Sequence, residues 1–196
     1  MQKLNDQHYI NLVIGGDVHA FAVLVDRYKN LVFTLSLKML QSREEAEEVA
    51  QDVFIKVYKS LEKFKTESKF STWLYRITYN SCIDTLRSKK RNASLFSLND
   101  FEEDEVVSLI NVLDTIEERE RKQMIQKCLS LLPPEESFLL NLYYFQGNSL
   151  KEISKIMSIN ENNLKIKLFR SRRRLAGILK TQLEPEIINQ YENEGR

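Results

Sequence analysis

Aromatic side chains alternate with basic and polar ones along the run FKTESKFSTWLYRITYNSCID, which spans Phe64–Asp84. Aromatic rings can stack on the flat faces of unpaired nucleobases, which contributes about 1–3 kcal/mol per base. Extruding a base from a duplex costs a few kcal/mol, so one or two stacking contacts suffice to trap it once opening begins. The run therefore predicts a site for single-stranded nucleic acid, in which Asn80 can contact a base edge. A second interpretation stays open, in which Trp73, Ile77 and Tyr79 simply belong to the core.

The run SLKEISKIMSINENNLKIKLFRSRRRL, from Ser149 to Leu175, predicts a helix-turn-helix whose second helix is strongly basic. Six of the ten residues from 165 to 174 are Lys or Arg. Each residue of an α-helix is rotated by about 100° from the one before it. On this basis one sector of the second helix holds residues that would pack against the rest of the protein, and the opposite side holds apolar groups among cations. The packing sector is Leu164, Leu168, Ser171 and Leu175; the far side is Ile166, Phe169, Arg170 and Arg173, flanked by Lys165 and Lys167.

Exposed apolar side chains among cations are expected on a helix that lies in the major groove of duplex DNA. They can contact thymine methyls there, while Arg and Lys bind phosphates or guanine edges. In the alternative interpretation, Phe169 packs on another helix and the cations form a solvated face. The preceding capped helix, the short turn and the density of charge favour groove binding. A site for duplex DNA and a site for single-stranded DNA in one chain together suggest that the protein opens promoters.

The charges are segregated along the 196 residues, although the net charge is only +1. Residues 1–92 carry a net charge of +4 and residues 119–183 a net charge of +8. Between them, residues 93–118 hold eight acids and no Lys or Arg, and residues 184–196 carry −3. Two basic blocks that flank an acidic connector predict two modules that face a polyanion.

Apolar residues recur at helical spacing nearly throughout, and Gly and Pro are few, so we predict an all-α protein. Two small helical domains are expected, over residues 1–92 and 119–183. A flexible acidic linker over 93–118 joins them, and an acidic tail follows over 184–196. Helix starts are predicted by the capping-box patterns Ser42–Glu45 and Ser149–Glu152, and Asn160 is expected to cap the last helix. Further helices are expected over about 72–90 and from Pro134 to about residue 147.

Neither of the two cysteines, Cys82 and Cys128, has metal-ligand spacing, so both are expected to be buried reduced thiols. We therefore expect no metal site and no cofactor. The N-terminus does not resemble a leader, and no apolar run approaches the roughly 20 residues of a membrane span, which predicts a cytoplasmic protein. Without a His cluster or a Gly-rich phosphate loop, an enzyme such as a nuclease is disfavoured, and no small-molecule substrate is expected.

Four motifs in sequence, GDVHAFAVLVDRY, EEAEEVAQDVFIKVY, FSTWLYRITYNSCIDTLR and LPPEESFLLNLYYFQGNSLKEIS, are specific in combination. Through them the chain resembles the bacterial RNA polymerase sigma factors of the extracytoplasmic-function (ECF) group, over about 17–91 and 119–179. The resemblance implies a sigma region 2 helical bundle and a sigma region 4 helix-turn-helix. It also implies a non-enzymatic role: binding core polymerase and directing promoter-specific initiation by −35 duplex recognition and −10 strand melting.

The resemblance further implies roles for individual residues. The residues implied to dock on the clamp coiled coil of RNA polymerase are Glu48, Gln51, Asp52 and Phe54. The residues implied to bind the −10 element and its melted strand are Phe64, Lys65, Ser68, Lys69, Phe70, Ser71, Trp73, Arg76, Asn80 and Arg87. The residues implied to bind the −35 duplex are Asn162, Lys165, Ile166, Lys167, Phe169, Arg170 and Arg173.

The implied partners are core RNA polymerase, bound through its clamp and flap, promoter DNA, and a membrane-anchored anti-sigma factor. The acidic linker would run through the basic channel of the polymerase toward the RNA exit, a role that its net charge of −8 independently fits. Three residues depart from the family pattern and leave the −35 sequence open. Ile166 replaces a small polar residue, Lys167 replaces the usual Arg, and Ser158 stands where Gly is frequent.

A competing hypothesis is a helix-turn-helix transcriptional regulator that is not a polymerase subunit. Its N-terminal block would then serve dimerisation or sensing. The acidic helix face over Glu44–Asp52 and the aromatic loop favour the polymerase subunit, because a repressor needs neither.

Overall fold

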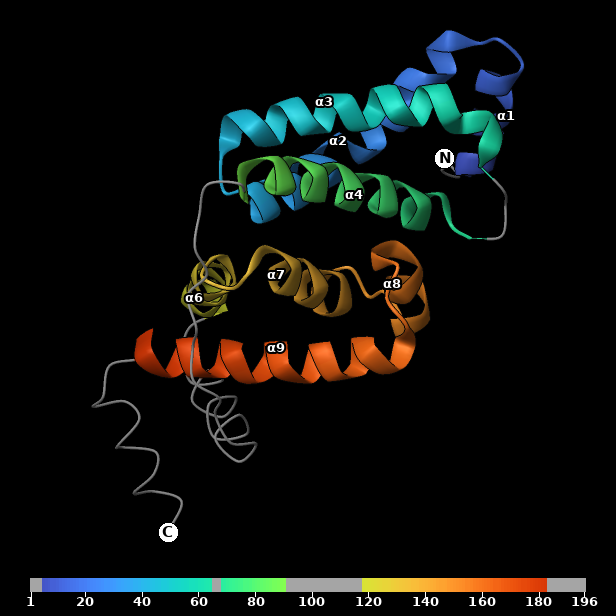
Figure 1. Cartoon of the computed structure of the whole chain (residues 1–196). Helices are drawn as coiled ribbons and strands as arrows, with labels where there is room; N and C mark the ends of the chain where they lie inside the picture. Colours follow the sequence, from blue (N-terminus) through green and yellow to red (C-terminus); the bar gives the residue numbers. More distant parts are fainter. Residues whose placement is uncertain (1–4, 65–67, 91–117, 183–196) are drawn as a thin grey trace. The chain divides into compact units, whose positions relative to one another are not determined.

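The computed structural model describes residues 5–64, 68–90 and 118–182, and every regular element among them is helical (Figure 1). The predicted all-α class is therefore confirmed. The chain divides into two compact units, Met1–Ser94 with Ser149–Ile159, and Leu95–Asn148 with Asn160–Arg196. The linker and the acidic tail expected from the sequence lie outside the described residues, apart from Glu118. The exact domain boundaries stay a prediction.

The first unit is built from three long amphipathic helices and three shorter elements. They are α1 (Asp6–Ile14), α2 (Val18–Leu40), α3 (Arg43–Ser60), the 3₁₀ turn η1 (Leu61–Lys63), α4 (Phe70–Lys90) and the short α8 (Leu150–Met157). Their apolar faces meet in a core whose members are fully buried: Ile10, Leu24, Val32, Leu35, Met39, Val53, Val57, Leu61, Leu74 and Cys82. Burial of these faces is the main term that holds such helices together.

Local capping fixes where these helices begin. Asp17 accepts a hydrogen bond from the backbone N–H of His19 at 2.9 Å and so caps α2. Ser42 accepts one from the N–H of Glu45 at 3.4 Å, while the Glu45 carboxylate pairs with Lys89 on α4. The helix α4 begins at Phe70, two residues earlier than the sequence predicts, so Phe70 and Ser71 belong to a helix rather than to the loop.

The second unit consists of α6 (Glu118–Ser130), α7 (Pro134–Leu140), the π-type turn η2 (Asn141–Phe145) and α9 (Glu161–Gln182). Its large buried side chains are Cys128, Leu129, Leu132, Phe138, Leu139, Leu142, Leu164, Leu168 and Leu179. Two acids in the first turn of α7 form ion pairs with α9: Glu135 with Lys167, and Glu136 with Arg174. These pairs join the N-terminus of α7 to the basic helix.

The helix that the sequence predicts from Pro134 to about residue 147 is not uniform. Its second half widens into η2, where the N–H of Gln146 donates to the Asn141 carbonyl at 3.1 Å. Gly147, with φ 63°, then ends the segment in a conformation that glycine adopts without strain. The wider turn leaves Tyr144 and Phe145 exposed while Leu142 stays buried.

The predicted capping box at the start of α8 is complete. The Ser149 hydroxyl accepts from the Glu152 N–H at 3.3 Å, and the Glu152 carboxylate accepts from the Ser149 N–H at 2.9 Å. The second of these bonds is the main cause that lowers the pKa of Glu152. Asn160 caps α9 as expected, because its side chain accepts from the N–H of Asn162 at 2.9 Å.

The turn between α8 and α9 places Ser158 in the left-handed region, with φ 55°. A side chain with a Cβ is strained there, whereas glycine is not. Replacing Ser158 with Gly should therefore raise the free energy of unfolding by about 0.5–1 kcal/mol, measured as a higher urea midpoint. The matched control is Ser88→Gly on the exposed face of α4, which should lower it by about as much. A loss of stability at both positions would contradict this account of the turn.

Both cysteines are free and buried, as the sequence predicts, and burial raises the pKa of the Cys82 thiol to about 11. Within the described ranges, no helix combines the length and the hydropathy that crossing a bilayer requires.

Candidate nucleic-acid interface

Four aromatic rings, here called the aromatic cluster, pack together beside the start of α4: Tyr28, Phe64, Phe70 and Trp73. The ring centroid of Phe70 lies 5.4 Å from that of Tyr28, 5.7 Å from that of Phe64 and 5.8 Å from that of Trp73. Phe70 is only 4% exposed, so it forms the buried centre of the cluster. The family resemblance implies that Phe70 contacts DNA, but this burial favours a supporting role, in which Phe70 fixes the other three rings.

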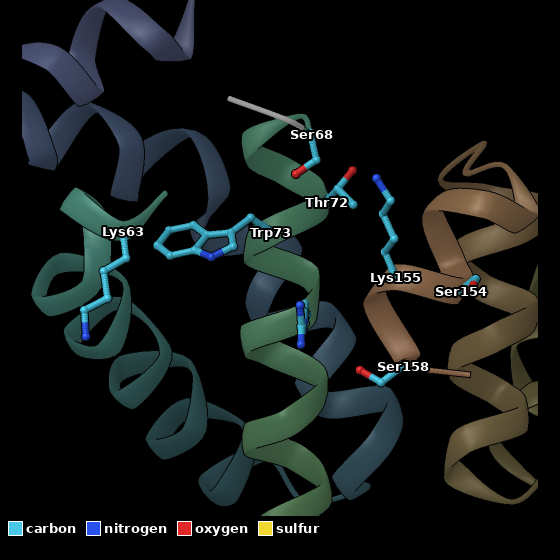
Figure 2. Close-up of a pocket in the computed structure, with 8 residues that line it drawn as sticks. Lys63, Ser68, Thr72, Trp73, Ser154, Lys155 and Ser158 are labelled. Carbon is cyan, nitrogen blue, oxygen red and sulfur yellow. The ribbon is translucent and has the colours of Figure 1, made fainter. Parts of the chain in front are cut away.

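Trp73 is the half-buried edge of this cluster, and its ring centroid lies 5.2 Å from that of Phe64. It lines a cavity of about 530 Å³, here called the Trp73 cavity, with Lys63, Ser68, Thr72, Arg76, Ser154, Lys155 and Ser158. Figure 2 shows the indole projecting from α4 on the side of Lys63, with Ser68 and Thr72 at the start of the helix. This volume is in the range of small-ligand sites, which allows an unstacked base to enter.

The other predicted −10 residues on α4 share one face of the helix. Trp73, Arg76, Asn80 and Arg87 recur at intervals of three, four and seven, and the last three are exposed. Two further predicted residues flank the cluster. Ser71 is half-buried, and the Nζ atom of Lys69 lies 3.3 Å from Oε1 of Glu152. Lys69 keeps 77% of its side chain exposed, so this ion pair is weak. Lys65 lies outside the described residues.

The basic helix α9 divides into two faces as its sequence pattern predicts. Leu164, Leu168 and Ser171 are buried, and Leu175 is half-buried beside Cys128 and Leu179. On the other side Asn162, Lys165, Ile166, Phe169 and Arg170 are exposed. Ile166 is 52% and Phe169 39% exposed, which leaves two large apolar groups in contact with solvent on a cationic face.

Two predicted DNA contacts on α9 have partners of their own. The guanidinium of Arg173 lies 5.7 Å from the ring centroid of Phe169, a cation–π distance, so these side chains are held as a pair. Lys167 forms its ion pair with Glu135 and is only 28% exposed. Lys167 thus tethers α9 to α7, which the sequence could not reveal because the two residues are 32 positions apart.

The face of α3 that is predicted to dock on polymerase is open to solvent. Glu48, Gln51 and Asp52 are exposed, while Phe54 is half-buried. The structure adds two apolar residues that sequence analysis missed, Ile55 and Tyr58, which are 51% and 44% exposed. In the sequence, only the helical spacing of Ile55 and Tyr58 from Gln51 and Asp52 could have placed them on this face. Phe54, the neighbour of Ile55, makes it ambiguous which apolar residues of α3 face the core.

No group of three or more His, Cys, Asp or Glu side chains that could hold a metal ion occurs in the part of the chain that the structure describes. The titratable groups near the aromatic cluster are phenols, exposed cations and the carboxylate of Asp6, which accepts a hydrogen bond from the Tyr28 hydroxyl. Burial raises the pKa of Tyr75, next to the cluster on α4, to about 12. Aromatic faces beside exposed cations make this surface chemically suited to stacking and to charge pairing with a polyanion.

Known proteins resemble this chain in both sequence and fold. Two family models match, sigma-70 region 2 over residues 24–92 and sigma-70 region 4 over residues 122–175. The ECF RNA polymerase sigma factor SigW of Bacillus subtilis is 34% identical, over 85% of this chain and 92% of that protein. The ECF RNA polymerase sigma-E factor of Haemophilus influenzae is 32% identical, over 87% of this chain and 93% of that protein.

Two solved structures share the fold. CnrH in complex with the cytosolic domain of CnrY gives a TM-score of 0.63 at 19% identity, over 91% of this chain and 99% of that one. The sigma factor RpoE of Bartonella quintana, in complex with the anti-sigma factor NepR, gives 0.61 at 18% identity, over 83% and 98%. The helical fold, the two family models and the relatives at 32–34% identity lead to one conclusion: this chain belongs to the ECF family of RNA polymerase sigma factors.

Proposed function

We propose that this sigma factor opens promoters by trapping a flipped base of the −10 element against Trp73, on the α4 side of the Trp73 cavity, while α9 reads the −35 duplex. Sigma factors are non-catalytic subunits that bind core polymerase and DNA in transcription initiation. The observation that carries the finer proposal is the aromatic cluster, whose half-buried edge, Trp73, lines a cavity sized for a base. Asn80 and Arg76 share the face of Trp73, where they would contact a base edge and the strand backbone.

In the second unit, the exposed face of α9 would enter the major groove near −35. Ile166 and Phe169 would contact thymine methyls, and Lys165 and Arg170 would bind phosphates or guanine edges. Arg173 would act together with Phe169, because its guanidinium rests on that ring. Lys167 would contribute mainly by orienting α9 through Glu135.

Replacing Phe169 with Ala in assembled holoenzyme should lower the affinity for a −35 duplex about tenfold, since the thymine contact and the support of Arg173 are lost together. Fluorescence anisotropy on a labelled duplex measures this. The control is Phe145→Ala, an exposed aromatic of the same unit outside α9, which should leave the affinity unchanged. A duplex with uracil in place of thymine tests the contact itself. If the variant loses the same factor on both duplexes, Phe169 does not contact a thymine methyl.

The exposed face of α3 would dock on the clamp of core polymerase, with Glu48, Gln51 and Asp52 supplying charge and polarity. The flap would bind the second unit, and the acidic linker would follow the basic channel toward the RNA exit. We place the protein in the cytoplasm. An anti-sigma factor, membrane-anchored as is usual in the group, would hold it inactive. RpoE of Bartonella quintana was solved in complex with the anti-sigma factor NepR, which supports this partner.

The experiment that tests this proposal is selection of host-genome fragments by holoenzyme assembled from core polymerase and the full chain. Aligned fragments should share two short motifs at a fixed spacing. Substitutions at Trp73 should relax only the motif nearer the start site, and substitutions at Phe169 only the other. Enrichment of a single motif, or loss of both motifs with either substitution, would contradict the assignment of two separate readers.

A further inference from the structure

The basic helix α9 does not present all of its charge to a ligand. Six cations lie between positions 165 and 174, and three of them are held by α7 and η2 within the second unit. Lys167 and Arg174 form ion pairs with Glu135 and Glu136, the two acids in the first turn of α7. Because α7 packs alongside α9 (Figure 1), both ion pairs bridge the same two helices.

The third of these cations is Arg172. Its guanidinium lies 5.4 Å from the ring centroids of both Tyr143 and Tyr144 on η2, which is a cation–π distance. The Nε atom of Arg172 is buried, so the side chain lies along the protein rather than extending into solvent. Lys165 and Arg170, in contrast, are exposed, and they form no ion pair or ring contact with the residues that the structure describes. Fewer charges of α9 are thus available to a polyanion than its sequence indicates.

The two ion pairs between α7 and α9 are partly shielded from solvent. Lys167 and Arg174 are both half-buried, so salt screens their pairs less than it screens an exposed pair. Glu136 is only 15% exposed, and its Oε2 atom is buried without a hydrogen-bond partner among the described residues. A phosphate that drew Arg174 away would leave this carboxylate as an uncompensated, largely buried charge. Exchange of the carboxylate for a phosphate is therefore unfavourable.

The number of cations that contact phosphates determines how strongly a helix binds DNA of any sequence. Each cation that neutralises a phosphate releases a counterion, so the logarithm of the affinity falls with the logarithm of the salt concentration, by a slope of about 0.9 per contact. A cation that stays paired with a carboxylate forms a neutral unit and releases no counterion. Such a cation adds to the charge counted in the sequence without adding to the attraction for DNA.

We propose that Glu135 and Glu136 limit the sequence-independent attraction of α9 to DNA, by keeping Lys167 and Arg174 paired within the protein while α9 lies in the major groove. The inference rests on the proposed function, because it requires α9 to bind the −35 duplex. The two acids act through the cations that they hold, and are positioning residues rather than DNA contacts.

The cations that remain for DNA are Lys165, Arg170 and Arg173, the last of which rests on the ring of Phe169. With fewer phosphate contacts, binding to unrelated sequences is weaker and holoenzyme leaves them sooner. The base contacts of Ile166 and Phe169 then contribute a larger share of the binding free energy at the −35 element.

The test measures the affinity of holoenzyme, assembled with the full chain, for two short labelled duplexes by fluorescence anisotropy. One duplex carries the motif farther from the start site in the fragments that wild-type holoenzyme selects, and the other carries the same bases in shuffled order. Glu135→Gln and Glu136→Gln each remove a charge at nearly constant size. Each should raise the affinity at 50 mM salt about fivefold on both duplexes, and about threefold more of it should be lost by 200 mM than in the wild type. Core polymerase is identical in every assembly, so its own DNA contacts cancel in the comparison.

Two further variants separate a released cation from a general loss of negative charge. Combining Glu135→Gln with Lys167→Gln should return the salt dependence to that of the wild type, because no cation is released. Glu161→Gln is the matched control. It removes the same charge from the first turn of α9 itself, where Glu161 is exposed and has no ion pair among the described residues, and it should not steepen the salt dependence.

Two outcomes overturn the inference and leave the proposed function intact. In the first, neither Glu135→Gln nor Glu136→Gln steepens the salt dependence, which would mean that the ion pairs only orient α9. In the second, the double variant keeps the steeper dependence, or Glu161→Gln reproduces it, which would make general charge responsible. If wild-type holoenzyme binds the motif duplex no better than the shuffled one, the proposed function of α9 fails together with the inference.

Discussion

Replacing Trp73 with Ala is expected to lower the yield of open complexes about tenfold to a hundredfold while leaving the affinity for core polymerase unchanged. The indole is the half-buried edge of the aromatic cluster and lines the Trp73 cavity. Loss of one aromatic stacking partner costs about 1–3 kcal/mol per base. Permanganate reactivity of unpaired thymines measures opening, and competition for labelled core polymerase measures binding.

The variant Trp73→Phe separates stacking from packing. It keeps an aromatic face at the cavity, so most of the open-complex yield should return. A loss of open complexes and polymerase binding in equal proportion would show that Trp73 supports the fold of the first unit. Equal yields for the Ala and Phe variants would also contradict the stacking role.

Reversing the charge at Asp52, by replacement with Lys, is expected to weaken association with core polymerase about tenfold or more at low salt. Asp52 is exposed on α3 beside Glu48 and Gln51, and close charge pairs at interfaces contribute at least about 1.5 kcal/mol. The loss should shrink as ionic strength rises, because salt screens exposed charges. Surface plasmon resonance over a salt series measures it.

Asp26→Lys is the matched control, since it makes the same change of two charge units on α2. The side chain of Asp26 is 77% exposed and forms a surface ion pair with Lys29 at 2.6 Å, which contributes little to stability. Circular dichroism of both variants should match that of the wild type. Unaltered association of the Asp52 variant, or an equal loss in the Asp26 variant, would remove this face of α3 from the interface.

Sequence patterns anticipated the elements whose signals are local. The Ser149–Glu152 capping box, the cap at Asn160 and the two faces of α9 each depend on residues within about two helical turns. The four motifs likewise carried the family resemblance, which the matches over residues 24–92 and 122–175 confirm. These matches, with the curated relatives, also decide against a helix-turn-helix regulator that is not a polymerase subunit.

Features that depend on long-range packing could not be predicted from the sequence. The partnership of Lys167 with Glu135 and the hydrogen bond of Tyr28 to Asp6 join residues 32 and 22 positions apart. The burial of Phe70 depends on rings contributed by α2 and by the segment before α4. The π-type turn begins at Asn141, where Asn141 and Leu142 are buried in the second unit. No single-helix pattern contains this information.

The most direct test of the central claim is run-off transcription with core RNA polymerase on fragments of the host genome, with and without this protein. Transcripts that appear only with the protein, and whose start sites follow two shared elements at the −10 and −35 positions, are the predicted result. The same transcripts should weaken with Trp73→Ala. An assembled holoenzyme that produces no specific transcripts, although it binds duplex DNA, would contradict the claim that this chain opens promoters.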